Sequence, residues 1–384
     1  MTTMIDKINA AFERDKTSGF VAKTADQLPL SFESITDEWL TAILCGNVPG
    51  AAVTSHNLSE KDNGSSNRRK IYLTYNAAGE AAGLPKALFC KATHDLANRI
   101  VLGVSGGALG EVTFYNRIRP LLDIEAPVSV FANYDPESAN SIIVMHDISD
   151  DVMEFCNHNT VMTKERARSQ MRVLGRLHGK CYSDPELAKR IHEIVTFKEF
   201  WEKSLAFGFE DGCIRGFKEG KDVIPPRLFA REAEIWPATE DSVRELDSLP
   251  NTLAHCDVHL KNWYVAGNGE MALSDWQCCG RAHWGRDLAY TIGTALKVED
   301  RRAWEKELVA YYLEQLAENG GPKVSFEEGF RHYRRQFLGA LAYWTITLCP
   351  SPSIPDMQPR DITLEFIRRI TTAMDDLDTL DAVA

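Results

Sequence analysis

The sequence lacks the features that mark several classes of protein. Its nine cysteines are scattered and form no CxxC pair, which argues against a disulfide framework and suits reduced thiols. No run reaches the ~20 apolar residues that a membrane-spanning helix needs. The first residues, MTTMIDKINAAFERDK, carry a charge every few positions, unlike a signal peptide. We therefore expect a cytoplasmic protein.

An excess of basic residues is also missing. The chain has 43 Lys and Arg against 55 Asp and Glu, for a formal net charge of −12. Nucleic acids and anionic membranes both require a basic surface, so neither is expected as a partner. A small molecule is the expected partner instead. The 384 residues, 44% of them hydrophobic, can bury a large core, and at ~150 residues per domain they predict two or three lobes.

Strand-like and helix-like patterns divide the chain into two parts. Runs rich in β-branched and aromatic residues predict strands in the first part, at 51–58, 70–76, 86–93, 126–134 and 140–147. One helix is expected there at 107–122, and the glycine-rich stretch from Leu102 is expected to form a mobile loop before it. Apolar periodicity predicts long helices in the second part, at 166–182, 301–318, 325–348 and 360–380. The sequence therefore predicts an N-terminal lobe at 1–145 and a C-terminal lobe at 146–384.

A hairpin pattern brings two oxygen donors together in the second part. Two short strand-like runs flank Asn268-Gly269, the strongest signal for a two-residue hairpin turn. Such a turn places Asn262 opposite Asp275, with about 5 Å between their Cα atoms. An amide oxygen and a carboxylate suit Mg²⁺. Asp257 lies just before the hairpin, where it is free to face a substrate.

An Asp followed five positions later by Asn, then a hairpin and a second Asp, is the active-site layout of kinases. The motifs that carry it here are residues 255–262 (HCDVHLKN), 275–277 (DWQ) and 287–290 (DLAY). They resemble those of the aminoglycoside phosphotransferase and choline kinase superfamily, especially its ecdysteroid-kinase-like and bacterial phosphotransferase branches. Residues 31–44 are also similar to the opening helix of those branches, and residues 174–182 are similar to their first large-lobe helix. The resemblance therefore runs from about residue 30 to the C-terminus and adds a leading helix to the N-lobe. It implies an α+β, bilobal protein-kinase-like fold, with a small β-rich N-lobe and a large, mainly helical C-lobe.

The resemblance also implies a kinase that uses ATP and Mg²⁺, with a role for each matching residue. Asp257 would orient the substrate hydroxyl and deprotonate it, and Asn262 and Asp275 would hold Mg²⁺. Asp287 would cap a helix and brace the metal loop. The remaining positions would contact the nucleotide or its phosphates: Lys91 and its helix partner Glu111, the phosphate-covering turn Gly64, Ser65, Ser66 and Asn67, the hinge residue Met145, and His259.

Other interpretations of the same residues stand beside these. The cluster of His255, Cys256, Asp257 and His259 would be a zinc site if three or four ligands converged, with Cys278, Cys279 or His283 as a further ligand. The adjacent Cys278 and Cys279, however, point opposite ways on an extended chain. His255 then braces the catalytic loop, and Cys256 stands where relatives carry glycine. Lys91 alone would be a solvated lysine, Glu111 a first-turn glutamate favoured by the helix dipole, and His259 a surface histidine. A pseudokinase, which binds without turnover, is the alternative from another functional class.

The acceptor side is expected between 197–236 and 325–348. These segments mix aromatic, acidic and basic residues and end in the apolar stretch FLGALAYWTITL. This mixture suits a polycation poorly. It predicts a neutral or anionic hydroxylated acceptor with an apolar body, and the alternative is a cationic acceptor of the aminoglycoside or choline type.

Overall fold

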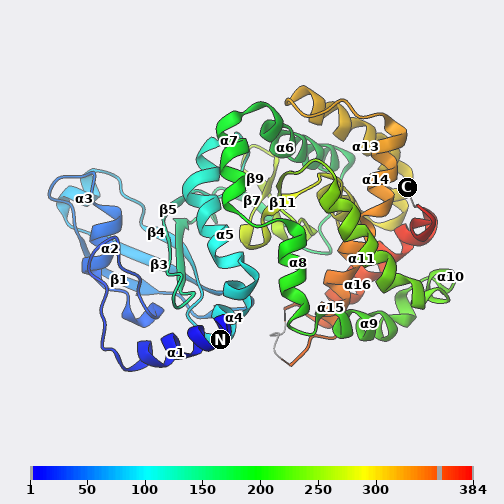
Figure 1. The fold of residues 1–384 in the computed structure, drawn as a ribbon. Coiled ribbons are helices and arrows are strands. Elements are labelled where there is room, and N and C mark those ends of the chain that lie inside the picture. The colour runs from blue at the N-terminus through cyan, green and yellow to red at the C-terminus, as the bar shows by residue number, and fades with distance from the viewer. Residues whose placement is uncertain (1–2, 353–356, 383–384) are drawn as a thin grey trace. The chain divides into compact units, whose positions relative to one another are not determined.

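A computed structural model describes residues 3–352 and 357–382. The chain forms two compact units (Figure 1). The first comprises Met1–Pro120 and Pro127–Asp150, and the second comprises Leu121–Ala126 and Asp151–Ala384. The short segment Leu121–Ala126 is held within the second unit by a hydrogen bond of 3.3 Å from the Leu273 amide to the Glu125 carbonyl.

The first unit is built on an antiparallel sheet with the strand order β1-β3-β4-β6-β5, and β2 pairs with the free end of β3. The strands are β1 Val53–Leu58, β2 Asp62–Asn63, β3 Asn67–Tyr75, β4 Ala87–Ala92, β5 Ser129–Tyr134 and β6 Ser141–His146. Every strand predicted for this part is present. One face of the sheet packs with Trp39 and Leu40 in a buried apolar core. Strands β4 and β6 each have a neighbouring strand on both sides, so the backbone positions of Lys91 and Met145 are fixed by pairing on both edges.

Helices of the first unit are α1 Met4–Thr17, α2 Asp37–Leu44, α3 Ala77–Ala81, α4 Leu96–Ser105 and α5 Gly107–Thr113, with the short turns η1 Phe32–Ser34, η2 Phe114–Ile118 and η3 Arg119–Leu121. The expected mobile loop from Leu102 is wrong, because α4 continues to Ser105 and α5 begins at Gly107. Gly106 separates them with φ +88°, a left-handed conformation that glycine adopts without strain. The helix expected at 107–122 is therefore a short α-helix followed by a π-helical turn.

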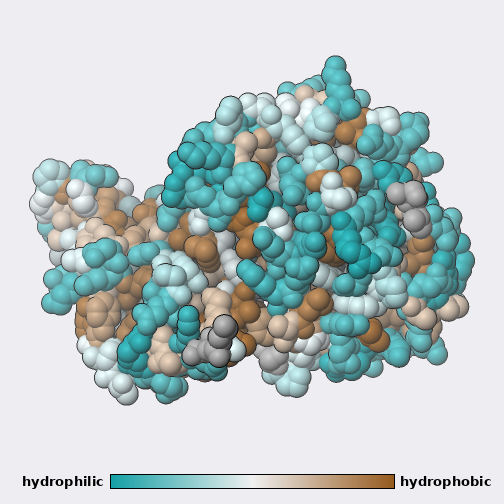
Figure 2. Space-filling model, in the orientation of Figure 1, coloured by the Kyte–Doolittle hydropathy of each residue, from teal (hydrophilic) through white to brown (hydrophobic). Residues whose placement is uncertain are grey.

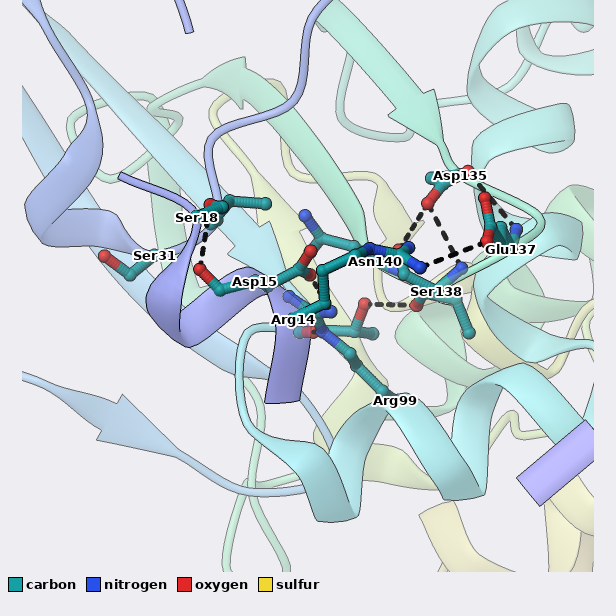
Figure 3. Close-up of polar contacts among 12 residues, drawn as sticks. Arg14, Asp15, Ser18, Ser31, Arg99, Asp135, Glu137, Ser138 and Asn140 are labelled. Carbon is teal, nitrogen blue, oxygen red and sulfur yellow. Dashed lines mark hydrogen bonds and ion pairs between the residues drawn. The ribbon is translucent and has the colours of Figure 1, made fainter. Parts of the chain in front are cut away.

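The N-terminal helix α1 is fastened to α4 by polar contacts (Figure 3). The Arg99 guanidinium, almost fully buried, forms an ion pair of 2.6 Å with Asp15 and lies over the ring of Phe12. Arg99 also donates through Nε to the Thr93 carbonyl, 3.1 Å. The same cation thus holds α1 on one side and the start of the β4–α4 connection on the other.

The second unit is mainly helical. Its helices are α6 Lys164–Ser183, α7 Pro185–Arg190, α8 Phe197–Leu205, α9 Phe209–Glu219, α10 Pro226–Phe229, α11 Glu232–Ser248, α12 Gly285–Ala295, α13 Val298–Glu318, α14 Phe326–Arg335, α15 Phe337–Leu348 and α16 Arg360–Asp376. Short 3-10 turns are η4 Ile191–Glu193, η5 Lys221–Val223, η6 Leu260–Asn262, η7 Trp276–Cys278 and η8 Thr379–Asp381. The four long helices predicted from periodicity are present, except that the stretch 325–348 divides into α14 and α15 at Gln336.

Short strands of the second unit carry the residues singled out in the sequence. They are β7 Val152–Phe155, β8 Thr252–Ala254, β9 Trp263–Ala266, β10 Met271–Leu273 and β11 Gly280–Ala282, in the orders β10-β9-β7 and β11-β8. The predicted two-residue turn is wrong. Val265 pairs with Met271, so the loop holds Gly267, Asn268 and Gly269, and Gly269 takes the left-handed conformation with φ +84°. A three-residue loop closed by a left-handed glycine is also a common hairpin connection.

The predicted fold class, α+β with a small β-rich lobe and a large, mainly helical lobe, is confirmed. Figure 2 shows that hydrophilic residues cover most of the visible surface of each unit, with smaller apolar patches between them. Among residues 3–352 and 357–382, no helix combines the length and the apolar character required to cross a bilayer.

Candidate active site

Asp257 lies at the centre of a hydrogen-bonded loop between β8 and β9. Its carboxylate is 16% exposed. Tyr290 donates to Oδ1 across 3.2 Å, and the Asn262 amide nitrogen donates to Oδ2 across 3.2 Å. The same Asn262 nitrogen also donates to the Asp257 carbonyl, 2.8 Å. The carboxylate is therefore held in one orientation and still partly open to a ligand.

Asn262 and Asp275 come to the same end of the β9–β10 hairpin, although their register differs from the predicted one. Ser274 lies opposite Asn262, and its backbone N–H and hydroxyl both donate to the Asn262 carbonyl, 2.9 and 3.1 Å. Asp275 follows directly and has φ +64°. Because the amide nitrogen of Asn262 is committed to Asp257, its amide oxygen is the atom left for a cation. An amide oxygen and a carboxylate are ligands that Mg²⁺ accepts.

His255 links the loop between β8 and β9 to the strand end before Asp275. It is fully buried. Its Nε2 lies 2.9 Å from the Ser274 carbonyl, and its Nδ1 accepts from the Asp257 backbone N–H across 3.3 Å. Because Nδ1 accepts a hydrogen bond, Nε2 is the ring nitrogen that donates to the Ser274 carbonyl. His255 is a structural histidine, as the kinase-like interpretation of the motif predicts.

Asp287 holds the backbone of this loop rather than capping its own helix. The carboxylate is fully buried in the first turn of α12 and accepts from the backbone N–H groups of His255, 2.7 Å, and Cys256, 2.9 Å. It also lies 3.2 Å from Nε2 of His178. Burial alone would raise the pKa of Asp287, but His178, His255 and these hydrogen bonds lower it overall. The expected helix cap is not formed, and Asp287 braces the catalytic loop directly instead of the metal loop.

Cys256 has φ +64°. A left-handed conformation costs a residue with a Cβ roughly 1–2 kcal/mol, whereas glycine adopts it without strain. The thiol is fully buried. The two bonds to Asp287 help to offset the cost of the strained backbone.

Two residues beside Asp257 have roles that the sequence did not reveal. Tyr290 is buried, and burial followed by the charge of Asp257 raises its pKa well above the usual range, so it stays protonated and donates. Arg286 donates to the Cys256 carbonyl, 2.9 Å. The only local signal was their spacing, since both flank Asp287 on the first turns of α12.

His259 is buried, at 6% exposed, so the surface-histidine interpretation is wrong. Its ring packs against Tyr290, Trp344 and Phe366, and its Nε2 lies 3.6 Å from Oδ2 of Asp257. Burial lowers its pKa, and the charges of Asp257 and Asp275 oppose the shift in part. His259 is therefore neutral near pH 7 and lies beside the Asp257 carboxylate.

The first unit brings Lys91 and Glu111 together. Lys91 on β4 and Glu111 on α5 form an ion pair of 2.7 Å in which the side chains are 6% and 5% exposed. Lys91 is therefore not a solvated lysine. Glu111 lies in the second turn of α5 rather than the first, so the helix dipole does not explain it. A buried pair of this kind fixes the ammonium group in one place.

Gly64, Ser65 and Ser66 form the turn between β2 and β3, and Asn67 begins β3. The Asn98 side chain donates to the Gly64 carbonyl, 2.8 Å. Asn67 accepts from the backbone N–H groups of His94 and Asp95, 2.9 and 3.0 Å, and donates to the Asp95 carboxylate, 2.6 Å. The Asn67 amide thus anchors the turn to the β4–α4 connection.

Met145 lies one residue before the end of β6, where it pairs with Phe89 of β4 and Ser129 of β5. Its side chain is buried. Two residues later, the Asp147 carboxylate pairs with Lys70 of β3 across 2.7 Å. The predicted hinge segment is thus fixed to the sheet on both sides.

The zinc interpretation finds no convergent ligand set. Within the part of the chain that the structure describes, no three His, Cys, Asp or Glu side chains gather as a metal site. His283 instead packs against His332, with the ring centroids 4.6 Å apart and the ring planes tilted by 52°. The Cys256 thiol packs in an apolar cluster with Cys213 and Ala342.

A cavity of about 300 Å³ lies among α9, α11 and α15, within the segments predicted for the acceptor. Its wall is mostly apolar and consists of Cys213, Ile214, Phe217, Lys218, Glu232, Ala233, Ile235, Trp236, Pro237, Thr239, Leu341, Ala342 and Thr345. The hydroxyls of Thr239 and Thr345 donate to carbonyls of their own helices. Cys213 and Ala342 belong to the same core cluster as Cys256. The cavity therefore adjoins the packing behind the catalytic loop.

The three arginines of α14 in the predicted acceptor segments are engaged elsewhere. Arg331 and Arg335 pair with Glu245, 3.3 and 3.2 Å, and Arg334 donates to the carbonyls of Leu377 and Asp378. None of the three lines the cavity. The cavity wall is therefore mostly apolar and carries one cation, Lys218, together with the carboxylate of Glu232.

A model of the ecdysteroid kinase-like family matches residues 60–320 of the chain. Among curated proteins, none matches it. The choline kinase LicA from Streptococcus pneumoniae is 14% identical, with a TM-score of 0.47 over 84% of this chain and 94% of LicA. A choline kinase from Cryptosporidium parvum is 11% identical, with a TM-score of 0.48 over 87% of this chain and 92% of its own. A putative aminoglycoside phosphotransferase from Ralstonia eutropha is 14% identical, with a TM-score of 0.47 over 88% of this chain and 97% of its own.

Proposed function

This chain belongs to the ecdysteroid kinase-like family, and we propose that it is an ATP-dependent kinase that transfers the γ-phosphate to a hydroxyl group of a small, partly apolar molecule. The observation that carries the proposal is the geometry of Asp257. Its carboxylate is oriented by Tyr290 and Asn262 and remains 16% exposed. A fixed carboxylate of this kind is suited to a substrate hydroxyl.

In the proposed reaction, Asp257 accepts the hydrogen bond of the acceptor hydroxyl and takes its proton as the oxygen attacks the γ-phosphorus. The bond from that phosphorus to the β–γ bridging oxygen breaks, and ADP leaves. Each carboxylate oxygen already has one donor from the protein, and a carboxylate accepts about four hydrogen bonds in all. Room therefore remains for the substrate. Neutral His259 adds no charge beside the attacking oxygen. Positioning supplies much of the rate enhancement in phosphoryl transfer.

Asn262 and Asp275 are the residues that would hold Mg²⁺. The donor set fits, because the Asn262 amide nitrogen faces Asp257 and leaves the amide oxygen for the cation. When bound, Mg²⁺ neutralises charge on the phosphates. Asn262 would in that case serve both sites, with its nitrogen on Asp257 and its oxygen on the metal.

Lys91, held by Glu111, would bind the α- and β-phosphates of ATP. The turn Gly64–Asn67 would cover the phosphates, and Met145 would lie at the adenine. Support comes from the burial of the Lys91–Glu111 pair and from the bonds that fix the turn. A protein that only binds nucleotide would share these features, so turnover is the measurement that separates the two.

We assign the apolar body of the acceptor to the cavity among α9, α11 and α15. Its size is at the lower end for a site that binds a small molecule, and its hydroxyl groups are satisfied internally. A polycation would meet one carboxylate at this wall, Glu232, beside the cation of Lys218. Aminoglycosides and choline are therefore disfavoured relative to neutral apolar alcohols.

The test is ADP release from ATP and Mg²⁺ with a panel of acceptors: steroid alcohols, hydroxylated fatty acids, choline and kanamycin. We expect the highest kcat/KM for an apolar alcohol. Ala233 is exposed and lines the cavity, so Ala233→Trp should raise the KM for that alcohol. Asp241→Trp, on an exposed part of the same helix outside the cavity wall, is the matched control. A higher kcat/KM for kanamycin or choline would contradict the assignment.

A further inference from the structure

Arg286 binds the backbone carbonyl of Cys256, whereas Asp287 binds its backbone N–H. It is fully buried in the first turn of α12, and its Nη2 donates to the Cys256 carbonyl across 2.9 Å. The neighbouring Asp287 accepts the backbone N–H groups of His255 and Cys256. Two consecutive residues of one helix therefore bind the peptide groups before and after Cys256.

The peptide group between Cys256 and Asp257 is fixed at both polar ends. Its carbonyl accepts from Arg286, and its N–H donates to Nδ1 of His255, 3.3 Å. Cys256 has φ +64°, which residues with a Cβ avoid unless their surroundings enforce it. The position of Asp257 follows from this peptide group, because Asp257 is the next residue.

Aromatic rings hold the guanidinium itself. Cζ of Arg286 lies 3.8 Å from the ring centroid of Phe197 at the start of α8, and 4.9 Å from that of Tyr343 on α15. Its Nε and Nη1 have no hydrogen-bond partner among the residues that the structure describes. The cation is thus positioned by contact with aromatic faces and by its bond to Cys256.

Helix α15 also approaches Arg286 through its backbone. A Cβ placed on Gly339 would lie 2.8 Å from Nη1 of Arg286. The absence of a side chain at Gly339 therefore leaves the space that the guanidinium occupies.

We propose that Arg286 is a positioning residue for phosphoryl transfer, which fixes the peptide group between Cys256 and Asp257 and couples it to α8 and α15. This inference rests on the proposed function in that Asp257 is taken as the carboxylate that meets the acceptor. A lysine cannot replace Arg286, because an ammonium group lacks the planar surface that stacks on rings and the fork of N–H donors.

The test compares Arg286→Lys with Arg335→Lys, a buried arginine of α14 that pairs with Glu245 and does not touch the loop. The first measurement is slow ATP hydrolysis with Mg²⁺, which needs no acceptor. The second is hydrogen exchange of the amides of residues 255–257. For Arg286→Lys we expect kcat to fall by about tenfold or more at an unchanged KM for ATP, as for a lost transition-state interaction. The amides should exchange about tenfold faster, as expected for local opening. Arg335→Lys should change neither.

Gly339→Ala provides an independent variant in case Arg286→Lys reduces the folded fraction. It displaces the guanidinium without removing it and should produce the same two effects. Wild-type exchange of the amides in both variants would overturn the proposal, and so would faster exchange with an unchanged kcat. If the wild-type protein releases no ADP either alone or with any acceptor of the panel, the proposed function is contradicted, whereas amide exchange still decides the role of Arg286.

Discussion

Replacement of Asp287 by Asn should weaken both the fold and the reaction. The carboxylate is fully buried and accepts two backbone N–H groups, at 2.7 and 2.9 Å. An Asn side chain offers one oxygen to the two donors and turns its own NH₂ toward the other. Of the two hydrogen bonds to the backbone, one is lost and leaves its buried N–H unsatisfied, and the other remains but no longer involves a charged acceptor. At roughly 1–3 kcal/mol for each such loss, we expect the free energy of unfolding to fall by about 3 kcal/mol.

The pH dependence distinguishes this cause from a general packing defect. The pKa of Asp287 is lowered in the folded protein, so its contribution is present above the ordinary pKa of about 4 and is lost as pH falls through the lower folded value. The difference between wild type and Asp287→Asn should therefore be constant from neutral pH down to about pH 5 and then shrink. Urea unfolding at several pH values measures it.

Glu305→Gln is the matched control for Asp287→Asn. Glu305 is also buried in the second unit and binds Arg301 and Tyr333 at 2.7 and 2.9 Å, away from the loop. Both variants should lose stability, but only Asp287→Asn should lose turnover per folded molecule, by about tenfold or more if each misplaced group costs ~1.4 kcal/mol. The role given to Asp287 would be refuted if Asp287→Asn were as stable as the wild type. It would also be refuted if the variant lost stability but kept wild-type turnover per folded molecule.

Three further changes test other parts of the molecule. Asp275→Ala should abolish the increase in thermal stability that ATP gives in the presence of Mg²⁺. In a separate measurement, stoichiometric zinc found by elemental analysis of the purified protein would contradict the metal assignment. Asp15→Asn removes a partner of buried Arg99 and should lower the free energy of unfolding of the first unit by about 2–4 kcal/mol, measured by urea unfolding; no change would show that α1 is not fastened by this pair. Cys256→Gly should change stability by less than about 1 kcal/mol, because relief of the left-handed strain offsets lost packing, whereas Cys256→Val should cost more than about 2 kcal/mol; equal effects in calorimetry would disprove the strain argument.

Local patterns were sufficient for the strands, the long helices and the motif of the catalytic loop. Short continuous apolar runs mark β4 and β6. The spacing of Asp257 and Asn262 survives any change in register because both lie in one loop. The turn at Asn268 failed because a two-residue and a three-residue loop share the same Asn-Gly signal, and tertiary pairing decided between them. The glycine-rich stretch from Leu102 predicts a loop, whereas in the structure a single left-handed glycine, Gly106, separates two helices.

Contacts between distant segments were beyond the reach of the sequence. Arg286 and Cys256 are 30 residues apart, and Tyr290 and Asp257 are 33 residues apart. The pattern of residues within a single helix or strand does not predict contacts between residues that lie so far apart in the sequence. Asp287 was correctly linked to the motif, but its partners could be identified only once the loop and α12 were packed together.

The most direct test of the central assignment is the turnover of Asp257→Asn. ADP release is measured from ATP and Mg²⁺ with the best acceptor of the panel, together with ATP affinity by thermal shift. We predict that turnover falls by about 10²–10⁴, the usual scale for a positioned base, while ATP affinity stays nearly unchanged. Turnover close to wild type would contradict the assignment of Asp257 as the residue that meets the acceptor hydroxyl.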